Sequence, residues 1–67
     1  MITVSINGSH RELPDGLTVE GLIQEFHLKP NSVVVEHNHQ VVHRNAYPST
    51  PVSDRDTIEI VRVVGGG

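Results

Sequence analysis

"ELPDGLTVEGLI", residues 12–23, joins a turn to the start of a helix and decides the fold. Pro14-Asp15-Gly16 has the chemistry of a tight turn, because proline presets φ and glycine accepts a positive φ. Thr18 is placed to cap a helix whose first turn carries an acidic residue, as the helix dipole favours. Apolar residues then recur at helical spacing and form one stripe of Val19, Leu22, Ile23 and Phe26. The pattern predicts a helix over residues 18–28 that ends at "KPN", because residues before proline avoid the α region.

Two strands are expected before this helix. In "MITVSIN", residues 1–7, apolar and polar residues alternate, which predicts a half-buried strand. Its apolar face consists of Ile2, Val4 and Ile6. Asn7-Gly8 is typical of a two-residue hairpin turn, since both residues tolerate a positive φ. The segment "HREL", residues 10–13, is therefore predicted to return as the second strand.

Two further strands are expected after the helix. "SVVVEHNHQVVH", residues 32–43, is typical of two short strands around a turn near Asn38-His39. Val33 and Val35 are predicted to face the core, whereas the pattern does not decide between Val41 and Val42 in the second arm. The polar segment 44–56 contains two prolines and predicts a loop with room for a short helical turn.

The last strand is predicted in "TIEIVRVV", residues 57–64, directly before three glycines. Ile58 and Ile60 alternate with polar residues, so they are expected on the core face. Strict alternation would also turn Arg62 inward, and burying a lone charge is costly. We therefore expect the strand to bulge or to leave the sheet near Val61.

This order of elements predicts an α+β fold in which one main helix packs across one face of a mixed sheet. A hairpin followed by a helical crossover allows the last strand to lie parallel to the first, with a right-handed connection. We expect a single domain over residues 1–67, with residues 64–67 forming a flexible C-terminal tail.

Composition excludes several classes of function. The chain has 67 residues and no cysteine, so disulfides, thiolate metal sites and a thiol nucleophile are excluded. A formal net charge of −3 with five Lys and Arg residues argues against nucleic-acid binding. The start of the chain has neither a signal peptide nor a long apolar run, so we expect a cytoplasmic protein without a membrane anchor.

The three terminal glycines suggest a chemical use of the chain end. The carboxylate of Gly67 is sterically unhindered, and Gly65 and Gly66 have no side chains that would obstruct a narrow channel. Ordering such a tail costs conformational entropy. Contacts between the folded body of this chain and a partner protein must offset that cost. We therefore expect Gly65 and Gly66 to thread a partner's active site and Gly67 to react there. Three apolar residues before the glycines are candidates for partner docking, with sheet packing as the alternative: Val61, Val63 and Val64.

The whole chain resembles the ThiS family of sulfur carrier proteins in thiamine biosynthesis. The resemblance rests on "ELPDGLTVEGLI", the turn in "VEHNH", the strand "DTIEIV" and the terminal "VGGG". It implies a ubiquitin-like β-grasp fold with a five-stranded sheet, or four strands plus a short one. Family members often carry Asn-Gly at the second turn, whereas here His39 follows Asn38, which weakens the case for a tight type I′ turn.

The resemblance also implies a function. An E1-like adenylating enzyme would use ATP to activate the carboxylate of Gly67, and a persulfide-bearing protein would supply the sulfur. The resulting thiocarboxylate would donate sulfur to thiazole synthase for the thiazole ring of thiamine. The chain would then be a protein cosubstrate without a bound cofactor, rather than an enzyme. The absence of a phosphate-binding loop and of a nucleophilic triad agrees with this interpretation.

Other interpretations remain open at this point. The small subunit of molybdopterin synthase uses the same tail chemistry, but "IVRVV" replaces its aromatic-Pro-Pro segment. A ubiquitin-like protein modifier is a second alternative, and a frayed chain end without function is a third. A histidine-rich metal module would use His37, His39 and His43, but solvated hairpin histidines explain that cluster better, so we predict no metal site. Two acidic pairs, Glu36 with Glu59 and Asp54 with Asp56, are interpreted as solvated rather than catalytic.

Overall fold

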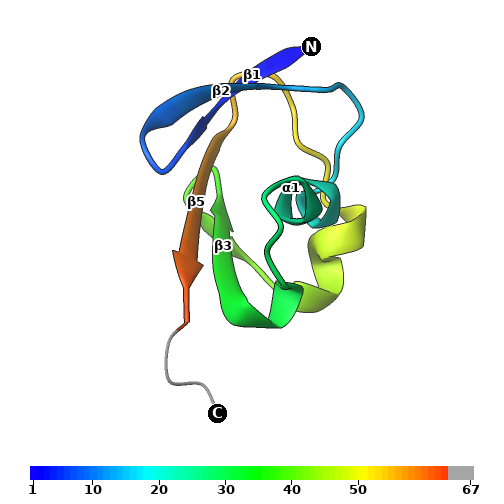
Figure 1. Cartoon of the computed structure of the whole chain (residues 1–67), viewed down its shortest axis with the longest axis vertical. Helices are drawn as coiled ribbons and strands as arrows, with labels where there is room; N and C mark the ends of the chain where they lie inside the picture. The colour runs from blue at the N-terminus through cyan, green and yellow to red at the C-terminus, as the bar shows by residue number, and fades with distance from the viewer. Residues whose placement is uncertain (64–67) are drawn as a thin grey trace.

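The computed structural model describes residues 1–63 of the chain. It consists of a five-stranded mixed sheet with one α-helix and two 3₁₀ helices on one side (Figure 1). The elements in chain order are β1 (Ile2–Ile6), β2 (Ser9–Leu13), α1 (Val19–Glu25), η1 (Pro30–Ser32), β3 (Val33–His37), β4 (Gln40–Val42), η2 (Arg44–Ser49) and β5 (Thr57–Arg62). The predicted α+β class and the five strands, including a short β4, are confirmed.

The sheet has the strand order β2-β1-β5-β3-β4, so the last strand lies at its centre. β5 runs parallel to β1, with Ser5 opposite Thr57 and Ile6 opposite Ile58. It runs antiparallel to β3 over five residue pairs. The predicted parallel placement of the last strand beside the first is confirmed.

The helix α1 begins as predicted but ends earlier. The hydroxyl oxygen of Thr18 accepts a hydrogen bond from the N–H of Gly21, 3.2 Å away. At the other end His27 has a φ of 58°, and the N–H of Leu28 donates to the carbonyl of Ile23 at 3.0 Å. The His27 N–H donates to the carbonyl of Gln24, which completes a Schellman motif. The predicted end at residue 28 is therefore wrong, because this motif reverses the chain before the proline is reached.

The core lies between α1 and the sheet. It includes Val33 and Val35 as predicted, and the choice between Val41 and Val42 falls on Val42, since Val41 is exposed. The polar segment 44–56 adds Tyr47 and Val52, which pattern analysis did not place in the core. The buried apolar residues are Val4, Ile6, Leu13, Val19, Leu22, Ile23, Val33, Val35, Tyr47, Val52 and Ile58.

The expected bulge in the last strand is absent from the described residues. β5 pairs with β3 without interruption up to the pair formed by Arg62 and Val33. Arg62 shares the inward side of the strand with Ile58 and Ile60, yet its side chain is exposed. It lines an open groove beside Leu28 instead of entering the core, so the strand continues without burying a charge. The predicted bulge is wrong because the core layer ends before the strand does, whereas the alternative, departure from the sheet near Val61, agrees with the end of β5 at Arg62.

Both hairpin turns have positive φ at their two central residues. The values are 51° at Asn7 and 85° at Gly8, and 51° at Asn38 and 70° at His39. These signs are those of a type I′ turn. The substitution of His39 for a glycine therefore does not prevent the tight turn, although it places a side chain in the left-handed region.

Candidate functional site: the end of the central strand

The chain leaves the sheet at the end of β5, next to η1. The N–H of Val63 donates to the carbonyl of Ser32 at 2.9 Å, which fixes the first residue beyond the strand. Figure 1 shows this exit at one end of the molecule, beyond the arrowhead of β5. The predicted docking residue Val64 and the predicted reactive tail Gly65, Gly66 and Gly67 lie outside the described residues.

Two asparagines hold β5 in place from the hairpin turns on either side. The side chain of Asn7 accepts from the N–H of Ile60 at 2.8 Å and donates to the carbonyl of Ile60 at 3.1 Å. The side-chain oxygen of Asn38 accepts from the N–H of Thr57 at 2.8 Å, and the backbone N–H of Asn38 donates to the carbonyl of Thr57 at 2.8 Å. The strand that leads to the tail is thus fixed near both of its ends.

Val61 and Val63 present apolar surface close to the exit. Val61 is 60% exposed and Val63 is 49% exposed. Val61 pairs with Val34, which is exposed as well, on the face of the sheet that α1 does not cover. Sheet packing, the alternative considered for Val61, is therefore excluded for its side chain, and partner docking stays a prediction.

A polar cluster lies at the opposite end of β5, around the buried carboxylate of Asp56. One of its oxygens lies 2.7 Å from Nε2 of His37 and accepts from the N–H of Ser53 at 2.8 Å. The other accepts from the side-chain amide of Asn38 at 3.1 Å. Burial alone would raise the pKa of Asp56, but the hydrogen bonds from Ser53, His37 and Asn38 outweigh it and hold the pKa below its usual value.

This cluster corrects two predictions. His37 and Asp56 were interpreted as solvated turn residues, yet Asp56 is buried and its carboxylate lies within hydrogen-bond distance of the partly buried His37. The fold brings together residues 19 positions apart, so no local pattern reveals the pairing. Ser53 and Asp56 are three residues apart in a polar turn directly before β5. This spacing is the one local signal that could have indicated a buried role for Asp56.

The remaining candidate groups do not form a catalytic or metal-binding arrangement in residues 1–63. No set of three or more His, Cys, Asp or Glu side chains there is placed to hold a metal ion, so His37, His39 and His43 do not converge. Asp54 accepts a hydrogen bond from the N–H of Thr3 at 2.7 Å and so links the loop before β5 to β1. Glu36 and Glu59 are direct cross-strand neighbours, one half-buried and the other exposed.

Comparison with known proteins agrees with this geometry. Residues 4–67 match the sequence model of the ThiS family. The chain belongs to the ThiS family. This membership confirms the resemblance inferred from the motifs.

Relatives and solved structures of the ThiS family extend the comparison. The sulfur carrier protein ThiS of Bacillus subtilis is 38% identical over 50 residues, which cover 75% of this chain and 76% of that relative. The crystal structure of the thiamine biosynthesis protein ThiS from Geobacter metallireducens matches with a TM-score of 0.83 and 31% identity. That match covers 98% of this chain and 100% of the other, and it confirms the β-grasp fold.

Two other relatives are much longer than this chain. The thiazole synthase of Paramagnetospirillum magneticum is 39% identical over 62 residues, which cover 92% of this chain but 19% of the synthase. The thiazole synthase of Magnetococcus marinus is 36% identical over 64 residues, or 20% of its length. The chain thus spans about a fifth of the length of the thiazole synthases that it matches. Among the described residues, no helix combines the length and apolar character needed to cross a bilayer.

Proposed function

We propose that this chain is the sulfur carrier of thiamine biosynthesis and that the carboxylate of Gly67 is the group that carries the sulfur. The observation that carries the proposal is the match to the ThiS family through residue 67, which includes the three glycines. The fold supports it, because the central strand is held at Thr57 and Ile60, and Val63, the last described residue before the glycines, is held by the carbonyl of Ser32. A rigid body with a slender end is what delivery of a carboxylate into a partner's active site requires.

The chemistry follows from the weakness of a carboxylate as an acyl donor. An oxygen of the Gly67 carboxylate attacks the α-phosphorus of ATP on an E1-like enzyme, and pyrophosphate leaves. A persulfide sulfur on a donor protein then attacks the acyl carbon, AMP leaves, and a thiol reductant cleaves the sulfur–sulfur bond. The product is a thiocarboxylate at Gly67, a soft nucleophile that transfers sulfur to the thiazole precursor. ATP is bound by the activating enzyme, and this cytoplasmic carrier itself needs no cofactor.

Thiazole synthase is the proposed acceptor of the sulfur. Two proteins with that name contain a segment similar to nearly the whole of this chain. A carrier segment and a synthase within one polypeptide act at high effective concentration, which favours partners that meet in the same reaction. The same reasoning supports a pairing of this chain with a thiazole synthase.

The direct test is the intact mass of the protein after incubation with ATP, a persulfide sulfur donor and an adenylating enzyme. The adenylating enzymes of the thiamine and molybdopterin pathways are supplied in separate reactions. Replacement of one oxygen by sulfur at Gly67, with the thiamine enzyme alone, is the expected result. No mass change with either enzyme would contradict the carrier function.

A shortened chain provides the matched control. Deletion of Gly66 and Gly67 removes the reactive end without touching the described contacts of β5. We expect an unchanged melting temperature and complete loss of the mass change. A clear fall in melting temperature would mean that these glycines serve the fold instead.

A further inference from the structure

Basic side chains gather where the chain leaves β5. Two surface grooves meet at Val63, and three of the five Lys and Arg residues of the chain line them. Lys29 and Arg62 lie in one groove together with His27, and Arg44 lies in the other. We call Lys29, Arg44 and Arg62 the exit collar.

Within residues 1–63, no acidic residue lines either of these grooves. The charged contacts found in residues 1–63 involve no residue of the exit collar: they join Met1 with Asp15, His37 with Asp56, and Arg55 with Asp54. Two other grooves mix both signs of charge, with Asp54 and Arg55 in one and Arg11 and Glu12 in the other. The exit collar is thus a local concentration of positive charge on a chain whose formal net charge is −3.

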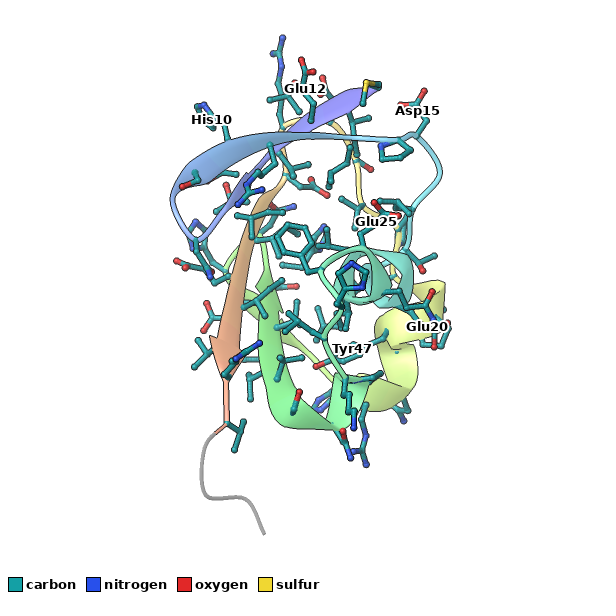
Figure 2. All side chains as sticks on the ribbon, in the orientation of Figure 1. His10, Glu12, Asp15, Glu20, Glu25 and Tyr47 are labelled. Carbon is teal, nitrogen blue, oxygen red and sulfur yellow. The ribbon has the colours of Figure 1, made fainter. Side chains whose placement is uncertain are left out.

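Two of the eight acidic side chains lie at the other end of the molecule, whereas Glu20 and Glu25 lie beside α1. Figure 2 shows Glu12 and Asp15 beside β1 and β2, at the end opposite the exit from β5. The exit collar and the carboxylates of Glu12 and Asp15 therefore lie toward opposite ends of the molecule. A partner that receives the tail meets the positive end first, and long-range attraction then favours the productive orientation.

We propose that the exit collar docks on a ring of carboxylates around the channel of the activating enzyme that receives the tail. This inference rests on the proposed function, since it names the chemistry of the surface that the carrier meets. Four residues separate Val63 from Gly67, so the tail extends at most about 14 Å beyond the exit. The carboxylate ring would therefore lie within about 14 Å of the reacting carboxyl carbon, where it contacts the collar and leaves the tail to enter alone.

A protein surface is favoured over nucleic acid as the occupant. Three basic side chains in a chain of net negative charge provide too few phosphate contacts for appreciable binding to a nucleic acid at physiological salt. The exposed Val63 at the centre of the collar adds an apolar contact, which protein interfaces use and phosphate backbones do not. An anionic membrane is the other possible occupant, and the experiment includes it.

The test compares two double charge reversals. Lys29→Glu with Arg62→Glu alters the collar, and Arg11→Glu with Arg55→Glu is the matched control. Each substitution lowers the charge by two, so both pairs change the formal net charge from −3 to −7. All four side chains are exposed. Arg55 precedes β5 and Arg62 ends it, so the two are separated by the length of the strand, roughly 17 Å, which exceeds the screening distance at physiological salt.

The measured quantity is the dissociation constant for the purified adenylating enzyme, without ATP, at about 0.05 M and about 0.5 M salt. We expect the collar pair to weaken binding about tenfold or more at low salt and the control pair less than about threefold. The difference should shrink at high salt. With the enzyme in excess, both variants should still acquire sulfur completely, because Gly67 is unchanged.

Three results would overturn the inference. Equal weakening by both pairs would mean that net charge matters and the collar does not. A difference between the two pairs that is the same at both salt concentrations would exclude electrostatic docking. Collar-dependent binding to vesicles of phosphatidylglycerol and phosphatidylcholine, in place of the enzyme, would assign the surface to a membrane. If the wild type binds in a salt-dependent, collar-dependent manner but never acquires sulfur, the proposed function fails while the docking surface stands.

Discussion

Asn7 and Asn38 occupy the same position in two different hairpin turns, and each forms two hydrogen bonds with one residue of β5. Both have a φ of 51°. Asn7 pairs with Ile60 from the side of β1, and Asn38 pairs with Thr57 from the side of β3. The two turns therefore act as a pair of clamps on the strand from which the chain leaves the fold.

These clamps predict a graded response to substitution. Alanine at either position loses the side-chain hydrogen bonds and also strains the left-handed backbone, so the free energy of unfolding should fall by about 2–3 kcal/mol. Glycine loses the same bonds without that strain, so Asn7→Gly and Asn38→Gly should cost only about 1 kcal/mol. Urea unfolding measures both series. Alanine variants as stable as the wild type would contradict the assigned role.

The Asp56 cluster predicts an acid-sensitive contribution to stability. The pKa of Asp56 is lowered in the folded state, so the folded protein favours the carboxylate more than the unfolded chain does. This contribution is fully present above the unfolded pKa of about 4 and is lost as the pH falls below it, through the folded pKa. The free energy of unfolding should therefore decrease steeply below about pH 4.

Two substitutions separate this effect from general acid unfolding. Asp56→Asn removes the titrating group and should flatten the acid limb, while lowering stability at neutral pH through the weakened contacts to His37 and Ser53. Asp15→Asn alters an exposed carboxylate and should leave the acid limb nearly as steep. Parallel acid limbs for the wild type and Asp56→Asn would show that Asp56 does not cause the dependence.

The Schellman motif at the end of α1 predicts a stabilising change. His27 occupies the left-handed position that glycine adopts without steric cost, and its side chain is exposed. His27→Gly should therefore raise the free energy of unfolding by about 0.5–1 kcal/mol, whereas His27→Ala should not. Thermal or urea unfolding of the two variants provides the comparison. A destabilised glycine variant would mean that the His27 side chain makes a contact that stabilises the fold by more than the left-handed backbone costs.

The like-charged pair on the open face of the sheet predicts a second stabilising change. Glu36 and Glu59 lie directly opposite each other on β3 and β5. Glu59→Lys converts repulsion into attraction and should add about 0.2–1 kcal/mol at low salt, with a smaller gain at high salt. Glu12→Lys, opposite the uncharged Thr3, is the control for the change in net charge. An equal gain in both variants would assign the effect to net charge alone.

The sequence predicted the features that local patterns encode. The cap at Thr18, the turn at Asn7-Gly8 and the inward Val33 and Val35 each depend on a few neighbouring residues, and each is confirmed. The resemblance of the terminal glycines and the first turn to known carriers supplied the family, which the comparisons confirm. The proposed reactive end, Gly67, lies outside the described residues and stays a prediction.

The incorrect predictions share a physical cause. The exposure of Arg62 depends on where the core layer stops, and the pairing of Asp56 with His37 depends on two loops that meet only in the fold. The Schellman motif that ends α1 was missed because a histidine in the left-handed region, here His27, has no distinctive sequence signal. The exit collar was missed because Lys29, Arg44 and Arg62 are far apart along the chain and come together only in the fold.

The central position of β5 has a mechanical consequence. A pull on the chain beyond Arg62, directed along the strand, loads the ladders to β1 and β3 in shear, so several hydrogen bonds must break together rather than one after another. A strand at the edge of the sheet would peel away under a weaker force. The strand that precedes the terminal glycines therefore resists such a pull more strongly than an edge strand would.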